Sequence, residues 1–188
     1  MIFVDVETTG LDSSRCAILS IGAVEFENPS NKFYIKCAPW KGAALYMQAF
    51  EVNGFDPENV WRMPNTQRVA IREFDKWAKL SCRDGIIAGH NFVRFDDIFI
   101  KEAYRREFNS MSTAYQRILD IMTVYQQSDL YNYNGAKLND LLSALGLPPE
   151  PHPHHALRGA MLELEAYSRL VNRKSIFRKD ALYGNFRL

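Results

Sequence analysis

Cysteine is scarce in this sequence of 188 residues, and the marks of a membrane or secreted protein are missing. Its three cysteines, Cys16, Cys37 and Cys82, are scattered along the chain and form no CxxC pair, so we expect buried free thiols in a reducing compartment. No apolar run is long enough to span a bilayer. The first residues lack the basic start and apolar stretch of a secretory signal, and we expect a cytoplasmic protein.

The chain also lacks an excess of either charge, a low-complexity tract and a clear internal repeat. Its formal net charge of +1 excludes a strong positive field that would attract a polyanion over a long range. A polyanionic partner would therefore have to be held by a local site. Apolar residues make up 47% of the chain and charged residues 24%, close to the average for globular domains. We predict a single domain over residues 1–188.

Hydrophobic patterning predicts an α/β fold. Short apolar runs bounded by turn residues predict strands at residues 2–6, 16–27, 33–37, 86–88 and 118–120. Apolar residues at helical spacing predict helices at residues 43–53, 66–80, 95–103, 138–145 and 156–171. Thr66 is the expected N-cap of the second helix. Three strands before any helix, followed by alternating strands and helices, predict one mixed sheet of about five strands flanked by helices.

The most informative residues are two carboxylates, Asp5 and Glu7, at the end of the first predicted strand. Side chains alternate along a strand, so these two project from the same face. Neighbouring carboxylates repel each other, and Mg²⁺ or Mn²⁺, which prefer oxygen ligands, would relieve that repulsion. On this pair alone, two solvated acids at a strand edge remain an equal explanation.

Two further segments connect this pair to a known family. Residues 5–11, Asp-Val-Glu-Thr-Thr-Gly-Leu, match the first motif of the DEDD exonucleases. Residues 89–96 resemble their second motif, and the spacing of Asn91 and Phe95 is similar to that in family B polymerase proofreading domains. Residues 154–159 resemble the third motif of the DEDDh branch, a His followed five positions later by an Asp. Up to about residue 170, the chain thus resembles the DEDDh 3′-to-5′ exonucleases, which implies a ribonuclease H-like fold.

The resemblance implies a metal or proton-transfer role for four residues. Asp5 would bridge two Mg²⁺ or Mn²⁺ ions, and Glu7 would hold the ion that activates water. Asp96 would hold the other ion, with Asp97 as the alternative. His154 would accept the proton of the attacking water, a task that imidazole can perform at neutral pH.

The resemblance also implies contacts with the substrate, a nucleic-acid 3′ end. The backbone around Thr8, together with Leu11, would grip the terminal nucleotide, and Asn91 would orient the loop of the second motif. The expected activity is a metal-dependent 3′-to-5′ exonuclease acting on single-stranded or frayed ends, with DNA favoured over RNA. The alternative is a nuclease-like module that holds a nucleic-acid end or a protein partner without cutting.

Gly159 departs from the pattern, because it stands where the family has its last Asp. The chain would then be inactive or weakened, or a bound metal would take an extra water and work slowly, or Glu163 would substitute. Glu163 lies one helical turn further, about 6 Å along the axis, so its reach would be strained. A purely structural explanation for the glycine is that another helix packs closely against residue 159. Weaker metal binding follows from the lost carboxylate, and we expect Gly159→Asp to raise cleavage about tenfold or more.

Other groups fit structural roles better. His152, His154 and His155 lie close together, but prolines interrupt the tract and no Cys is spaced as a zinc partner. The basic and aromatic tail at residues 172–188 could stack bases, although a tail folded back on the domain is the simpler expectation. A loop with Tyr131, Asn132, Tyr133 and Asn134 could border the cleft, and Asp120 is expected to be structural.

Two geometric checks test these assignments. The carboxylates of Asp5, Glu7 and Asp96 should lie within a few ångströms of one another at the end of the central strand. His154 should border the same cleft; if His155 faced the cleft and His154 were packed away, the register of the third motif would be wrong by one.

Overall fold

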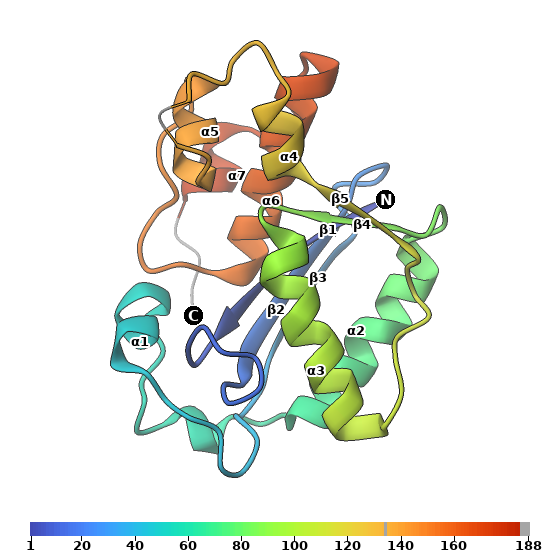
Figure 1. Cartoon of the computed structure of the whole chain (residues 1–188), viewed down its shortest axis with the longest axis vertical. Helices are drawn as coiled ribbons and strands as arrows, with labels where there is room; N and C mark the ends of the chain where they lie inside the picture. The colour runs from blue at the N-terminus through green and yellow to red at the C-terminus, as the bar shows by residue number, and fades with distance from the viewer. Residues whose placement is uncertain (134, 185–188) are drawn as a thin grey trace.

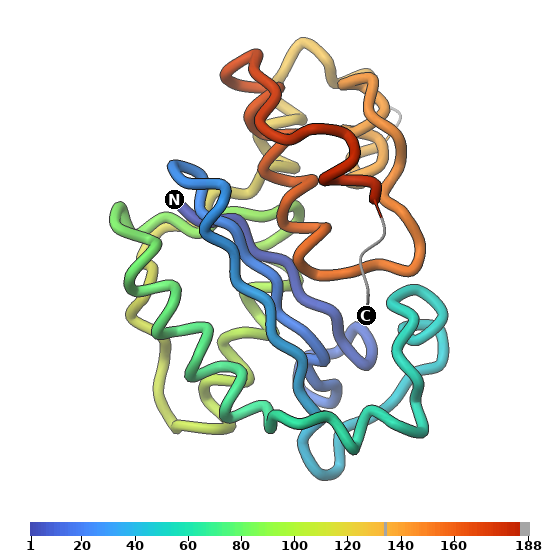
Figure 2. Tube along the Cα trace, turned by 180° about the vertical axis from the view of Figure 1, so that it is seen from behind, coloured from blue at the N-terminus to red at the C-terminus, as the bar shows by residue number. Residues whose placement is uncertain are grey.

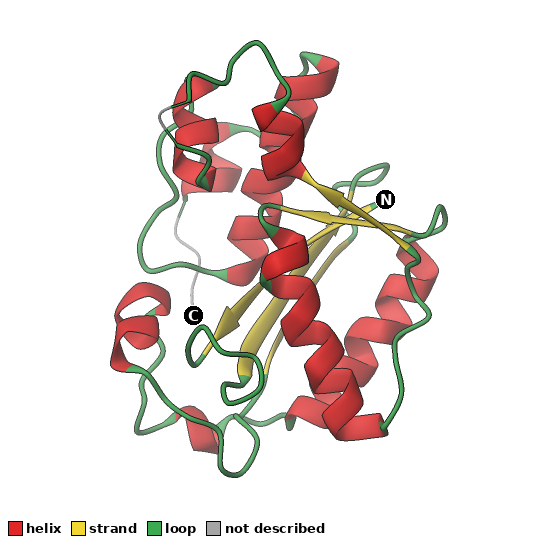
Figure 3. Cartoon of the chain, in the orientation of Figure 1, coloured by secondary structure: helices red, strands yellow, loops and turns green. Residues whose placement is uncertain are grey.

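The computed structural model describes residues 1–133 and 135–184. In these residues a five-stranded sheet has the order β3-β2-β1-β4-β5 and lies between helices (Figure 1; Figure 3). β1 pairs antiparallel with β2, and β2 with β3, while β1–β4 and β4–β5 are parallel pairs. The mixed sheet predicted from the sequence is confirmed. The strands are β1 (Ile2–Thr8), β2 (Ile18–Glu25), β3 (Lys32–Lys36), β4 (Ile86–Gly89) and β5 (Arg117–Asp120).

The predicted helices are present with their ends moved by a few residues, and Thr66 caps α2 by accepting a hydrogen bond from the Val69 N–H at 3.3 Å. Short helical segments at α4 and α7 were not expected from the sequence. The helices are α1 (Met47–Asn53), α2 (Gln67–Ser81), α3 (Asp96–Phe108), α4 (Ile121–Gln126), α5 (Leu138–Ala144), α6 (Ala156–Tyr167) and α7 (Lys179–Tyr183). The 3₁₀ and π turns are η1 (Val60–Arg62), η2 (Phe92–Arg94) and η3 (Ser168–Asn172).

The alternation of side chains along β1 divides the core into two layers. Ile2, Val4 and Val6 pack with α2 and α3 on one face of the sheet, and Phe3 packs with α6 on the other. Figures 1 and 2 show the C-terminal helices, orange to red, gathered at one end of the molecule. Asp5 and Glu7 follow the same alternation as Phe3, so both carboxylates face α6.

α6 lies unusually close to the sheet because glycine occurs where it crosses β2. A Cβ atom on Gly22 would lie 2.1 Å from the backbone nitrogen of Leu157. Gly22 is also the cross-strand partner of Asp5. The absence of a side chain at residue 22 therefore brings the first turns of α6 directly over the middle of β1 and β2.

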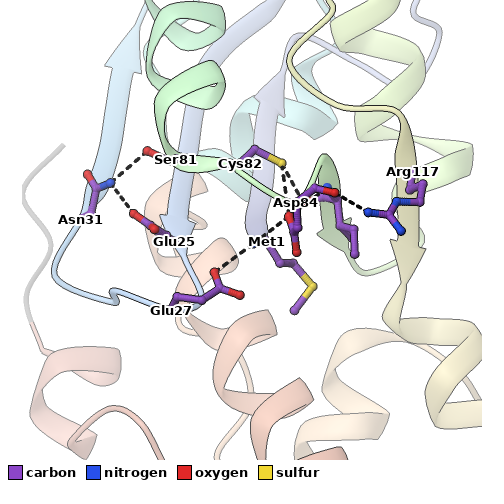
Figure 4. A network of polar contacts seen from close by, with 9 residues as sticks. Met1, Glu25, Glu27, Asn31, Ser81, Cys82, Asp84 and Arg117 are labelled. Atoms are coloured by element: carbon purple, nitrogen blue, oxygen red, sulfur yellow. Dashed lines mark hydrogen bonds and ion pairs between the residues drawn. The ribbon is translucent and has the colours of Figure 1, made fainter.

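A polar network closes the end of the sheet at which β1 begins (Figure 4). The amino group of Met1 forms ion pairs with Glu27 at 2.9 Å and Asp84 at 3.0 Å. Asn31 in the β2–β3 turn donates to Ser81 at the end of α2, at 2.9 Å. The two ion pairs join two turns to the start of β1. None of these contacts involves the carboxyl end of β1, where Asp5 and Glu7 lie.

The C-terminal tail folds back on the domain as far as residue 184, as expected. Glu165 on α6 accepts hydrogen bonds from the backbone N–H groups of Ile176 and Phe177, and Leu182 of α7 is fully buried. Phe186 and Arg187, which the base-stacking alternative included, lie outside the described residues. The three cysteines are buried free thiols. None of the helices described is long and apolar enough to cross a membrane.

Candidate metal and nucleic-acid site

The site begins where β1 and β4 separate. Their parallel pairing covers only Ile2 and Phe3 of β1, so the edge of β1 beyond Phe3 is no longer paired with β4. The first turn of α3 approaches this edge, and the Val6 N–H donates a hydrogen bond to Asp96 Oδ1 at 3.0 Å. A backbone donor of the central strand thus holds the second-motif carboxylate beside the first motif.

Two adjoining cavities open at this end of the sheet. The larger has a volume of about 690 Å³ and is lined by acidic groups, His154 and residues of the first motif and α1. The smaller, of about 480 Å³, reaches the second motif. Asp5 and Glu163 line both cavities. The acidic and basic residues around the two cavities are Asp5, Glu7, Asp12, Glu150, His154 and Glu163 in the first, and Asp5, His90, Arg94, Asp96, Lys137 and Glu163 in the second.

Burial above all, with acidic neighbours beside it, disfavours the charged form of the carboxylates around these cavities. Burial, then the nearby charges of Glu7 and Asp96, raise the pKa of Asp5 well above its usual value. Burial and its acidic neighbours likewise raise the pKa of Glu7 well above normal, and burial raises that of Asp96 to about 8. Burial and the charge of Asp96 raise the pKa of Glu163 well above its usual range. A divalent cation is the natural way to keep such groups ionised at neutral pH.

Glu150 is a site residue that the sequence reasoning missed. It is buried in the wall of the larger cavity, and its Oε2 lies 3.7 Å from His154 Nδ1. Burial raises the pKa of Glu150 to about 7. The signal in the sequence was its place between Pro149 and Pro151, because alternating prolines restrict the backbone of the segment that also carries His154.

The structure puts His154 and His155 in different surroundings. His154 lines the larger cavity, and its backbone N–H donates to the Val52 carbonyl of α1 at 2.9 Å. Burial, with the charges of nearby His152 and Arg158, lowers the pKa of His154 to about 4, so its imidazole is neutral at pH 7. His155 is buried, with its ring stacked on Tyr34 at a centroid distance of 4.3 Å. Of the two histidines, His154 is therefore the one that a substrate bound in the larger cavity can contact.

The first-motif residues expected to contact substrate also border the larger cavity. Thr8 is buried, and its Oγ1 donates to the Gly10 carbonyl at 2.7 Å. Leu11 stands at the rim with 85% of its surface exposed. The Asn53 side chain of α1 donates to the Thr8 carbonyl at 3.0 Å, which joins α1 to the end of β1. Figure 1 shows β1 directed toward α1 in this region.

The second-motif loop is held by Asp120, which is structural as expected. Asn91 has a left-handed backbone with φ of 56°, and its N–H donates to Asp120 Oδ1 at 3.0 Å. The same carboxylate accepts from the N–H groups of Val93 and Met122. Asn91 borders the smaller cavity. Asp97, the alternative ligand, is instead bound by Lys101 at 2.6 Å and by the hydroxyl of Tyr115.

Gly159 makes its close contact with a side chain of β1, not with another helix as the structural explanation supposed. A Cβ atom at this position would lie 2.1 Å from Asp5 Oδ2 and 2.8 Å from Asp5 Cγ. The carboxylate of Asp5 thus occupies the space that a side chain at residue 159 would need. Glu163, one turn further on, nevertheless reaches both cavities.

The tyrosines of the loop after α4 lie apart from the cavities, although Ala136 and Lys137 at the end of this loop border the smaller one. The Tyr131 ring packs edge-on against Tyr125, with their centroids 5.3 Å apart, and Tyr133 has 86% of its surface exposed. Neither tyrosine lines either cavity. Asn134 lies outside the described residues.

The donor set around the cavities fits a hard divalent cation in its chemistry, because it consists of carboxylate oxygens. Glu163 Oε2 is buried with no hydrogen-bond partner, as expected for an oxygen that a cation would contact. Within residues 1–133 and 135–184, no three His, Cys, Asp or Glu side chains are arranged as ligands of one ion. The convergence of Asp5, Glu7 and Asp96 on one ion therefore stays a prediction.

Comparisons with known proteins agree with this class of fold. The family model described as Exonuclease, of the RNase T type, matches residues 2–167. The chain therefore belongs to this exonuclease family, within the DEDDh group that the motifs indicated.

The relatives by sequence are ribonuclease T proteins. The protein from Photobacterium profundum is 30% identical over 118 residues, which are 56% of this chain and 52% of the relative. The protein from Buchnera aphidicola is 24% identical over 191 residues, 92% of this chain and 82% of the relative. The chain spans about half the length of the curated relatives that it matches first.

Solved structures of exonuclease I share the fold. One superimposes with a TM-score of 0.77 and 18% identity, covering 96% of this chain and 41% of that one. Another, from E. coli in complex with a dT13 oligonucleotide, has a TM-score of 0.74 and 17% identity, covering 92% of this chain and 41% of that one. At this identity the likeness establishes the fold.

Proposed function

We propose that this chain is a 3′-to-5′ exonuclease domain that hydrolyses single-stranded or frayed nucleic acid with Mg²⁺ or Mn²⁺. The observation that carries the proposal is the meeting of Asp5, Glu7 and His154 around one cavity, next to the cavity that holds Asp96. The relatives by sequence carry the name ribonuclease T, and exonuclease I, which shares the fold, was solved in complex with a DNA oligonucleotide. Of the two, we favour DNA as the substrate, and the buried free thiols suit a cytoplasmic site of action.

The chain's own residues suit the parts of this reaction. Asp5, Glu7 and Asp96 would hold the cations, which when bound stabilise the charge that develops during phosphodiester hydrolysis. His154 is neutral at pH 7 and faces the cavity, so it can accept a proton from water there. Exposed Leu11 offers an apolar surface beside a terminal base.

A cleavage assay on labelled single strands tests the proposal. The wild-type protein is incubated with 5′-labelled DNA and RNA of the same sequence, in the presence of Mg²⁺, Mn²⁺ or EDTA. We expect a ladder of products shortened from the 3′ end that requires the cation. Asp5→Ala should remove activity, and His154→Ala should lower it by about 10²–10⁴-fold, the usual contribution of general acid–base catalysis.

The control is Glu102→Gln, which removes one negative charge from α3 where Glu102 pairs with Arg105 on the surface. Its activity should equal that of the wild type. Binding of the labelled strand without cleavage, under all three conditions, would replace the exonuclease by the nuclease-like binding module. Cleavage that survives Asp5→Ala would show that another site is responsible.

A further inference from the structure

We propose that Glu163 supplies the fourth carboxylate of the divalent-cation site, in place of the Asp that position 159 lacks. The inference rests on the proposed function, because it assigns a residue to the same site. Residues 159 and 163 are four positions apart on α6, so they share one side of the helix. Compared with an Asp at residue 159, Glu163 carries its carboxylate one helical turn further along α6, on a side chain that is longer by one methylene group.

The position of Glu163 and the direction of its side chain support a role as a cation ligand. Glu163 is 3% exposed and borders both cavities together with Asp5, which connects the site of the first motif to that of the second. Its Oε1 accepts a hydrogen bond from the His90 N–H at 3.0 Å. His90 begins the second-motif loop, so this contact orients the side chain toward the carboxylates rather than toward the apolar layer.

The second oxygen of Glu163 lacks what a purely structural role would require. Its Oε2 is buried without a hydrogen-bond partner, and its charged neighbours Asp96, Glu150 and Asp120 are all acidic. A buried carboxylate normally has a cation or several donors beside it. A divalent cation between Glu163 and Asp5 would supply the missing partner.

Glu165 on the same helix provides a direct contrast. It is fully buried, but Arg169, Ser175 and the N–H groups of Ile176 and Phe177 donate to its two oxygens. Glu165 thus has protein donors on both carboxylate oxygens, whereas Glu163, two residues earlier, has one oxygen without a hydrogen-bond partner. This difference is the reason to assign Glu163, and not Glu165, to the site.

Gly159 belongs to the same arrangement. Asp5 Oδ2 lies where a Cβ at residue 159 would be, so Asp5 in its present position excludes a side chain there. With that space taken by Asp5, the next residue on this side of α6 that can bring a carboxylate to the cavities is Glu163.

Binding of Mn²⁺ to the whole chain tests this assignment independently of cleavage. Equilibrium titrations followed by electron paramagnetic resonance of free Mn²⁺ would compare the wild type, Glu163→Gln, Asp5→Ala and Glu102→Gln. Glutamine keeps the size of the side chain and the acceptor for the His90 N–H. We expect Glu163→Gln to weaken Mn²⁺ binding at least tenfold and to lower cation-dependent cleavage, while Glu102→Gln matches the wild type.

The outcomes separate this inference from the proposed function. If Asp5→Ala loses Mn²⁺ and Glu163→Gln binds it like the wild type, Glu163 is not a ligand and the exonuclease proposal stands. If the wild type binds no Mn²⁺ and does not cleave, both proposals fail. If Glu163→Gln unfolds, as far-ultraviolet circular dichroism would reveal, Glu163→Asp gives the answer: weaker Mn²⁺ binding supports the assignment, and unchanged binding overturns it.

Discussion

Asp5 and Gly159 compete for one small volume, and this controls what each position can do. The family pattern treats residue 159 as a lost ligand, and the sequence alone predicts that an Asp there restores cleavage. The structure adds a cost, because a Cβ at residue 159 would lie 3.3 Å from Asp5 Cβ and closer still to its carboxylate. An Asp at 159 therefore requires Asp5 to rotate.

We predict that the effect of Gly159→Asp depends on Glu163. With Glu163 in place, the new carboxylate duplicates an existing one and cleavage should change by less than about threefold. In Glu163→Gln, the same substitution should raise cleavage about tenfold or more, which needs only about 1.4 kcal/mol of transition-state stabilisation. Initial rates of the four proteins form a double-mutant cycle. An equal gain in both backgrounds would mean that the two positions act independently and that the tenfold expectation for the unmodified chain was correct.

The residues of the site could be predicted only as far as sequence motifs mark them. Asp5 and Glu7 were placed by strand alternation, and Asp96 by the second motif. Glu150 lies in none of these motifs, and the prolines beside it indicate only a restricted backbone. It reaches the cavity through a turn-rich segment whose path depends on contacts with other elements. One of these is the hydrogen bond from the His154 N–H to Val52 on α1.

At the scale of elements, α6 contacts both the centre of the sheet and the C-terminal tail. Its N-terminal turns cross Gly22 at backbone contact distance and cover Asp5, and its C-terminal half anchors the tail through Glu165. The periodicity of its apolar residues predicted this helix well. α4 and α7 have only six and five residues, so they depend on packing more than on local propensity, and the sequence gives little sign of them.

We predict that Glu165→Gln destabilises the domain by about 2–3 kcal/mol at pH 7, because charge-assisted hydrogen bonds are lost and an amide NH₂ would face protein donors. Burial alone would raise the pKa of Glu165, but hydrogen bonds from Ser175, Phe177, Arg169 and Ile176 outweigh it and lower the pKa. A carboxylate with a lowered pKa stabilises the fold above its unfolded value, about 4.3, and loses this effect as the pH falls through its folded value.

Urea unfolding of both proteins from pH 7 to pH 3.5 measures this contribution. The difference in unfolding free energy should be constant near neutrality and shrink below about pH 4. Glu102→Gln is again the control, since exposed ion pairs contribute little. A difference that does not vary with pH would mean that packing, and not the charge of Glu165, holds the tail against α6.

At the scale of the whole molecule, a nearly neutral chain gathers five of its 22 acidic residues around two adjoining cavities. The formal net charge is +1, yet five buried or half-buried acidic residues, Asp5, Glu7, Asp96, Glu150 and Glu163, border the two adjoining cavities. Composition could not reveal this, because the residues come from β1, α3, α6 and the segment before α6. Folding brings together carboxylates that are independent in the unfolded chain, so their repulsion is a cost of the native state alone.

A cation that binds only the folded state should therefore stabilise the whole domain. At a concentration of 100 times its Kd, a single Mn²⁺ contributes about 2.7 kcal/mol. For a chain of this size that corresponds to a rise in Tm of roughly 5–11 °C. Thermal unfolding with and without Mn²⁺, in buffer first treated with a chelator, measures the shift. Asp5→Ala should show almost none, and Glu163→Gln should need at least tenfold more Mn²⁺ for the same rise. An identical rise in Asp5→Ala would mean that Mn²⁺ acts elsewhere on the surface, because that variant keeps every other acidic residue of the molecule.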